Sequence, residues 1–214
     1  AENLDRFEGV YKSLARLINA DAAEIALMEN ATAAWLAPFT SIPFKAGDRI
    51  LTARESYASN YVNFLLWKER YGIEIDVIDG TVTGELSVDD LKRKLTDRTR
   101  LLAITHIPTG GGLVNPAEEV GKIVRPDGCY YLLDGCQSAG QIPIDVQALN
   151  CDFYSATGRK WLRGPRGTGF LYASKKAWSE LTPAVLDLHS AELKSSLTYA
   201  IRNDARRFEN WESS

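Results

Sequence analysis

Hydrophobic and polar residues alternate along this chain with two different periods. Residues 3–19 carry apolar side chains at helical spacing and predict an amphipathic helix. Beyond this helix, short apolar runs alternate with amphipathic stretches. The runs predict strands at 24–28, 49–52, 73–78, 101–105, 130–134, 152–155 and 169–173. The stretches between them predict helices near 31–39, 57–70, 87–95, 116–124 and 175–182.

This order of elements predicts an α/β fold. We expect three α/β/α layers, with helices on both faces of a mostly parallel, seven-stranded sheet. In such sheets, ligands gather at the carboxyl ends of the strands. Ser87 is expected to cap the helix that follows it, and Asn115 to cap a helix that begins at Pro116.

The last part of the chain has a different pattern. Residues 1–182 are expected to form one large domain, whereas 183–214 show little periodicity and predict a less regular segment. Phe208 and Trp211 lie close to the end of the chain, which is an unusual place for a domain to stop. We therefore expect the chain to be part of a longer protein.

Composition excludes several classes of protein. The 214 residues suffice for one substantial α/β domain or two small ones, and a net charge of -3 does not favour nucleic acid or an anionic membrane as a partner. No apolar run is long enough to span a membrane, and the first residues lack the basic start of a signal peptide. Cys129, Cys136 and Cys151 are odd in number and include no CxxC pair, which predicts free thiols and a cytoplasmic location.

The strongest candidate chemistry begins at Asp134. This carboxylate follows four strand-like residues, so it should lie at the sheet edge where a ligand can reach it. A carboxylate beside a pyridine nitrogen keeps that nitrogen protonated, as pyridoxal phosphate (PLP) requires. An aspartate that ends a strand and caps the next turn is the structural alternative. Gln137 could hydrogen-bond a phenolic oxygen of the ring, although a glutamine at such a position, taken in isolation, is more often a surface residue.

A lysine follows the next predicted strand. Lys160 lies in a loop where Gly158 permits close approach of the backbone, Thr157 offers a hydroxyl and Arg159 offers a planar fork for a phosphate. A lysine flanked by positive charge in a pocket tends to lose its proton and attack a carbonyl. Lys160 is therefore the candidate nucleophile.

Two upstream segments add cofactor-binding candidates. Ala31 and Thr32 begin a helix after a predicted strand, where backbone N–H groups favour a phosphate; a simple helix cap is the alternative. Tyr57 could lie flat on an aromatic cofactor, or it could be an ordinary core residue.

Several other motifs are absent or incomplete. The glycines at 110–112 match neither a dinucleotide fingerprint nor a P-loop, so they predict a turn and give little support to a nucleotide-binding protein. His106 is expected to be structural. With two histidines and no cysteine cluster, the sequence does not predict a zinc site.

Taken together, these segments resemble the class V aminotransferase family of fold-type-I PLP enzymes, which includes cysteine desulfurases, selenocysteine lyases and isopenicillin N epimerase. The similarity extends from about residue 10 to 212. The segments that carry it are 134–137, 145–146, 151–154, the lysine loop and 164–169. It implies the large domain of such an enzyme, acting as a homodimer on an amino acid by transamination, C–S cleavage or epimerisation.

The resemblance also implies a role for each candidate. Lys160 would form the Schiff base with PLP, and Asp134 would pair with the ring nitrogen. Gln137 and Thr109 would lie near the ring hydroxyl, and Tyr57 over the ring. The phosphate would be bound by Ala31, Thr32, Thr157 and Arg159.

The match differs from the family pattern in three respects. Tyr57 and Arg159 stand where desulfurases usually have histidine, and Glu212 stands where a threonine often reaches a neighbouring subunit's phosphate. The segment Arg206–Trp211 is expected at a subunit interface. The small domain, with its carboxylate-binding arginine and the loop of the desulfurase cysteine, is expected to lie outside this chain.

A second hypothesis therefore remains beside the enzyme. The chain could be a degenerate homologue that serves as a binding or dimerisation module without catalysis. Binding of PLP separates the two hypotheses.

Overall fold

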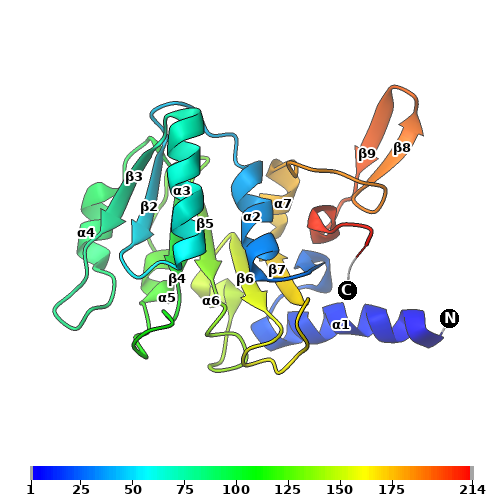
Figure 1. Cartoon of the computed structure of the whole chain (residues 1–214), viewed down its shortest axis with the longest axis horizontal. Coiled ribbons are helices and arrows are strands. Elements are labelled where there is room, and N and C mark those ends of the chain that lie inside the picture. The colour runs from blue at the N-terminus through cyan, green and yellow to red at the C-terminus, as the bar shows by residue number, and fades with distance from the viewer. Residues whose placement is uncertain (1, 213–214) are drawn as a thin grey trace.

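Seven strands form one central sheet in the computed structural model, which describes residues 2–212 (Figure 1). The strands are β1 (Ile25–Met28), β2 (Arg49–Ala53), β3 (Glu74–Ile78), β4 (Thr99–Thr105), β5 (Tyr130–Asp134), β6 (Phe153–Thr157) and β7 (Gly169–Ala173). Their spatial order is β1-β7-β6-β5-β4-β2-β3, and only β7 runs antiparallel to its neighbours among them. The predicted seven-stranded, mostly parallel sheet is confirmed.

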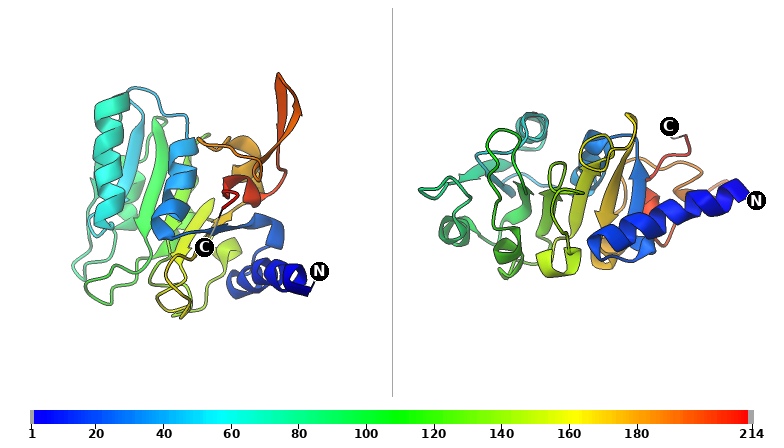
Figure 2. Two further views of the ribbon diagram at one scale, coloured as in Figure 1. Left: turned by 45° about the vertical axis from the view of Figure 1, so that its right-hand side comes forward. Right: turned by 90° about the horizontal axis from the view of Figure 1, so that it is seen from below.

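Helices cover both faces of this sheet, so the three-layer prediction is also confirmed (Figure 2). One face packs against α1 (Glu2–Ile18), α4 (Val88–Lys94), α5 (Ala117–Gly121) and α6 (Val146–Leu149). The other packs against α2 (Ala31–Ser41), α3 (Ala58–Tyr71) and α7 (Lys175–Glu180). The sequence did not predict α6, because its four residues are too few to show a helical period.

The central strand β5 shows why its sequence is continuously apolar. Tyr131 and Leu133 belong to the core on one face of the sheet, and Tyr130 and Leu132 to the core on the other. A parallel strand with helices on both sides must bury both of its faces, and each fully buried side chain of this size contributes about 1.5–3 kcal/mol. This strand holds Asp134 rigidly at its carboxyl end.

The two predicted helix caps have different outcomes. The Ser87 side chain accepts from the Asp90 N–H, as predicted. The prediction for Asn115 is wrong, because its amide bridges two other elements: it accepts from the Leu86 N–H at 2.9 Å and donates to the Thr105 carbonyl at 2.7 Å. These buried backbone groups would otherwise lack partners, so the amide contributes more there than at a helix end.

Residues after 182 form elements that the sequence pattern did not predict. A hairpin of β8 (Ala191–Ser195) and β9 (Thr198–Ile201) projects from the body, followed by the 3-10 helix η2 (Ala205–Phe208) (Figure 1). The large apolar side chains of this hairpin, such as Leu193 and Tyr199, are exposed. In β8, apolar and polar residues alternate over Ala191–Lys194, a strand signal of only four residues that the sequence prediction missed.

Buried charges tie the segment after the hairpin to the sheet. Glu209 accepts from the Leu27 N–H at 2.6 Å and from the Tyr11 hydroxyl at 3.0 Å, and its carboxylate lies 2.7 Å from His189 Nε2. Burial raises the pKa of this carboxyl. Arg207 donates to backbone carbonyls, including that of Trp178. Residues 205–209 are therefore packed on the sheet layer.

The structure also bears on membrane-spanning helices and on disulfides. No helix within residues 2–212 is both long and apolar enough to cross a bilayer. Cys129, Cys136 and Cys151 are free thiols.

Candidate functional site

A cavity of about 140 Å³ opens at the carboxyl edge of the parallel strands. All nine residues that the sequence predicted for a cofactor site line it, together with five others. The lining residues are Asn30, Ala31, Thr32, Tyr57, Asn60, Thr105, Ile107, Thr109, Asp134, Cys136, Gln137, Thr157, Arg159 and Lys160. The structure thus brings the predicted residues together, although they are spread over about 130 residues of sequence.

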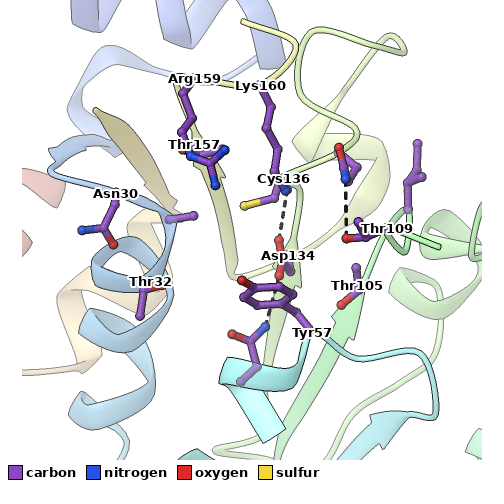
Figure 3. A pocket seen from close by; sticks show the side chains of 14 residues that line it. Asn30, Thr32, Tyr57, Thr105, Thr109, Asp134, Cys136, Thr157, Arg159 and Lys160 are labelled. Atoms are coloured by element: carbon purple, nitrogen blue, oxygen red, sulfur yellow. Dashed lines mark hydrogen bonds between the residues drawn. The ribbon is translucent and has the colours of Figure 1, made fainter. Parts of the chain in front are cut away.

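The sheet topology explains this convergence. The residues follow the carboxyl ends of β1, β2, β4, β5 and β6, which lie at one edge because these strands run in the same direction. The register places Thr105 beside Asp134, and Asp134 beside Ser155. The loop after β6 then carries Arg159 and Lys160 over the strand ends (Figure 3).

Asp134 is nearly buried, with 5% of its surface exposed. Its Oδ1 accepts from the Cys136 N–H at 3.0 Å, and its Oδ2 accepts from the Asn60 amide at 3.1 Å. Within residues 2–212, no lysine or arginine forms an ion pair with it. The bond from Cys136 fits the turn-capping alternative, while the remaining acceptor capacity of the carboxylate is available to a donor in the cavity.

Two cations extend toward the cavity from the lysine loop. Arg159 and Lys160 both reach down from this loop, on the side opposite Tyr57 (Figure 3). In the part of the chain that the structure describes, neither side chain has a hydrogen-bond or ion-pair partner. Two unpaired positive charges beside a cavity favour an anionic ligand.

The start of α2 offers a second feature that suits an anion. Asn30 caps the helix by accepting from the Ala33 N–H at 2.9 Å. The first N–H groups of a helix, here those of Ala31 and Thr32, have no partner within the helix. Thr157 lies nearby on β6, and its hydroxyl donates to the Thr168 carbonyl over a long 3.4 Å.

The remaining predicted residues form the rim of the cavity. Tyr57 is half exposed at the start of α3, where its ring faces the cavity (Figure 3). Gln137 donates to the Thr109 hydroxyl at 3.5 Å and accepts from the Trp161 indole N–H at 3.0 Å. The Gln137 amide is therefore oriented by two neighbours rather than being a free surface group.

Among the described residues, no group of three or more His, Cys, Asp or Glu side chains is arranged to hold a metal ion. The glycines at 110–112 lie in a turn, as predicted, and no helix starts directly after them.

Comparison with known proteins decides the family. The chain matches the family model "Aminotransferase class-V" over residues 1–210. The chain belongs to the class V aminotransferase family. This family consists of PLP-dependent enzymes, and the resemblance noted from the sequence is thereby confirmed.

Curated relatives of this class V chain are cysteine desulfurases. It is 38% identical over 178 residues to a probable cysteine desulfurase of Xylella fastidiosa (strain 9a5c), an alignment that covers 82% of this chain and 42% of the relative. It is 35% identical over 187 residues to the cysteine desulfurase of Salmonella newport (strain SL254), covering 86% of this chain and 46% of the relative. The chain thus spans less than half the length of these relatives.

Solved structures agree with the fold. The apo cysteine desulfurase of Thermococcus onnurineus NA1 superposes with a TM-score of 0.87 at 26% identity, covering 98% of this chain and 52% of that one. The cystine C–S lyase C-DES, in complex with its product cysteine persulfide, also has a TM-score of 0.87, at 25% identity over 97% of this chain and 56% of its own. The class V chain therefore has a fold-type-I large domain.

Sequence reasoning missed several residues of the cavity in this class V chain, of which Asn60 is the most informative. Asn60 lies three residues after Tyr57, so both lie on one face in the first turn of α3. A polar residue at that spacing from a candidate site residue was the available signal. Trp161, which does not line the cavity, orients Gln137 by a hydrogen bond across 24 residues, and no local pattern predicts such a contact.

His106 is structural in this class V chain, and it makes stability depend on pH. Burial lowers the pKa of its ring from 6.5 to about 4, and its Nδ1 is buried without a partner in the described part of the chain. An unfolded histidine binds a proton below pH 6.5, whereas the folded one stays neutral until about pH 4. The free energy of unfolding therefore has its full value above pH 6.5, and it decreases as the pH falls toward 4, because protons bind the unfolded chain more tightly than the folded one.

We expect this loss to reach about 3 kcal/mol of unfolding free energy, since one pKa unit corresponds to about 1.4 kcal/mol. Urea unfolding across this pH window measures it. A His106→Gln variant, which cannot titrate, should show a shallower dependence on pH. Equal slopes for the variant and the wild type would contradict the assignment.

Proposed function

We propose that this chain is the cofactor-binding part of a PLP-dependent enzyme that acts on an amino acid, with C–S bond cleavage as its reaction. The observation that carries the proposal is the cavity that unites Lys160, Asp134 and an anion-binding edge. The curated relatives, which are named cysteine desulfurases, favour the reaction type.

The donor set of the cavity fits PLP. Asp134 offers a buried carboxylate for the ring nitrogen, and Lys160 offers an amine for the aldehyde. Tyr57 offers an aromatic face for the ring, while Thr109 and Gln137 lie where they can reach the ring hydroxyl. The Thr105 hydroxyl adds a buried oxygen that has no partner in the described part of the chain, as expected in a polar site that is completed by a ligand.

The phosphate would lie at the start of α2. Ala31 and Thr32 provide backbone N–H groups there, and Arg159 provides the charge. Thr157 can join them by exchanging its long bond to Thr168 for one to the phosphate. In this arrangement, the phosphate would accept hydrogen bonds from the start of α2 and would also neutralise the Arg159 guanidinium.

When bound, PLP supplies an electron sink for the bonds at the substrate's α-carbon. The chain's own residues bind and orient it and move a proton. Asp134 would favour the protonated ring nitrogen, and the Lys160 amine would hold the cofactor at its aldehyde. The Lys160 amine would also be placed to take or return the proton of the substrate's α-carbon.

Tyr57 and Arg159 bear on which reaction follows. The family resemblance places histidine at both positions in desulfurases, whereas this chain has a phenol and a guanidinium there. Histidine is the usual proton-transfer residue at such positions, and it is absent from both. We therefore assign the proton transfer at the α-carbon to Lys160 alone, and transamination and epimerisation are the competing outcomes.

Titration of the chain with PLP tests the proposal. We expect a visible absorption band, whose loss on borohydride reduction leaves PLP bound to Lys160 in a peptide mass map. Release of sulfide from cysteine or cystine would support C–S cleavage, and formation of a keto acid without sulfide would indicate transamination. No binding up to millimolar PLP would overturn the proposal and favour a degenerate binding module.

Two further features belong to the proposal. Residues 1–182 would form the PLP-binding domain, with 183–214 leading toward a small domain, and the whole protein would be a cytoplasmic homodimer. Arg206 and Trp211 lie in the segment proposed for the subunit interface. Arg206 packs over the Tyr11 ring at 3.7 Å and pairs with Glu8, whereas Trp211 is exposed and free to contact a partner. Light scattering of the whole protein measures the oligomeric state.

A further inference from the structure

Asn60 lines the cavity but has no role in the proposed cofactor contacts. It is the third residue of α3, where its backbone N–H donates to the Tyr57 carbonyl at 2.9 Å. Its side chain is 6% exposed and donates to Asp134 Oδ2 at 3.1 Å. An amide that is almost completely buried thus reaches from the helix layer to the end of the central strand.

The Asp134 carboxylate depends on such donors. It is buried and, among the described residues, lacks an ion-pair partner, so hydrogen bonds must offset its loss of hydration. The Cys136 N–H binds Oδ1 from the turn that follows β5, and Asn60 binds Oδ2 from α3. A carboxylate with a donor on each oxygen, from two different elements, has a single orientation.

Asn60 also connects two groups that the proposed function uses together. Tyr57, one turn earlier, faces the cavity with its ring, and Asp134 lines the same cavity. The Asn60–Asp134 bond therefore links the start of α3, which carries the ring that would cover a flat cofactor, to the carboxylate that would pair with its edge.

We propose that Asn60 is a positioning residue that holds the Asp134 carboxylate in the orientation required by the ring N–H of PLP. The proposal rests on the proposed function, since it concerns the same cofactor. Asn60 donates to one oxygen of Asp134, and the carboxylate, which lines the cavity, keeps acceptor capacity for the ring N–H. It acts through Asp134 and does not itself contact the reacting atoms.

Two substitutions of Asn60 and one control test this role. Asn60→Leu keeps the size of the side chain and removes the donor. Asn60→Asp keeps the shape and replaces the donor by a second carboxylate, so that one proton must be shared at low pH and like charges repel at high pH. Asn63→Leu, about one turn further along α3, is the matched control, because the Asn63 amide donates to the Ser59 carbonyl at 2.9 Å and does not contact Asp134.

The readouts are the PLP dissociation constant and the pH profile of the visible band, neither of which requires turnover. Asn60→Leu is expected to weaken PLP binding about tenfold, or about 1.4 kcal/mol, and to shift the pH profile. Asn60→Asp should bind PLP progressively more weakly as the pH rises. Asn63→Leu should match the wild type, and Asn60→Leu should leave the pH profile unchanged when Asp134 is already replaced by Asn.

A merely structural role would lower the melting temperature of Asn60→Leu without moving the pH profile, and this result would overturn the proposal. The isosteric Asn60→Asp variant provides the same test if Asn60→Leu does not fold. If the wild type binds PLP and both variants bind it with unchanged affinity and pH profile, this inference alone fails. If the wild type binds no PLP, the proposed function fails together with it.

Discussion

Replacing Lys160 by alanine is expected to abolish covalent attachment of PLP and to reduce turnover by a factor of about 10³ or more. The Lys160 amine is the nucleophile and the proton carrier of the proposed site, and a positioned acid or base alone contributes about 10²–10⁴-fold. Asp134, Arg159 and the start of α2 remain in the variant. PLP should therefore still bind, but more weakly. Borohydride reduction should then leave no PLP covalently attached to the protein.

Two control variants show whether the effect is due to the amine of Lys160, to its positive charge or to the loss of any lysine. Lys160→Arg keeps a cation in the cavity but offers no nucleophilic amine, so it should lose attachment as completely as the alanine variant. Lys122→Ala removes an exposed lysine away from the cavity and should behave as the wild type. Borohydride-stable attachment in Lys160→Ala would assign the role to another lysine.

Replacing Gly135 by alanine is expected to destabilise the chain by about 3 kcal/mol or more. A Cβ at this position would overlap the Tyr154 ring and hydroxyl. Tyr154 cannot move aside, because it is fully buried and its hydroxyl is hydrogen-bonded to Ser138 Oγ at 2.8 Å. Forcing atoms into a packed core costs about 1–3 kcal/mol, and more where the neighbour is fixed.

Thermal unfolding measures this effect, and a loss of that size should lower the melting temperature by roughly 6–12 °C in a chain of this length. Gly110→Ala is the matched control, since no atom lies within 4 Å of a Cβ built there. It should change stability by no more than about 0.5 kcal/mol. Because Gly135 directly follows Asp134, Gly135→Ala should also weaken PLP binding. If Gly135→Ala had the same melting temperature as Gly110→Ala, the Tyr154 ring would have moved aside, and the prediction would be wrong.

The sequence allowed us to predict that the candidate residues lie close together, although none of them is a specific signal by itself. Asp134, Lys160 and Thr32 each follow or begin a predicted element, and parallel strands bring such positions to one edge. Asn60 was not predicted: its spacing from Tyr57 was a local signal, but its hydrogen bond to a residue 74 positions away cannot be predicted from that spacing. Asn115 was misread for a related reason: its position suited a helix cap, but its partners are on other elements.

The sequence by itself determined the layered α/β fold, the cofactor class and the positions of the candidate residues. The spacing of apolar residues and the residue types of a loop are local properties of a sequence. In β5 and in the lysine loop, both can be seen within a few residues. Only the tertiary structure decided that the cations of the lysine loop have no partner among residues 2–212, that Asn60 donates to Asp134 and that a Cβ at 135 would overlap Tyr154. These features depend on the distances between elements, which packing sets and a local pattern does not encode.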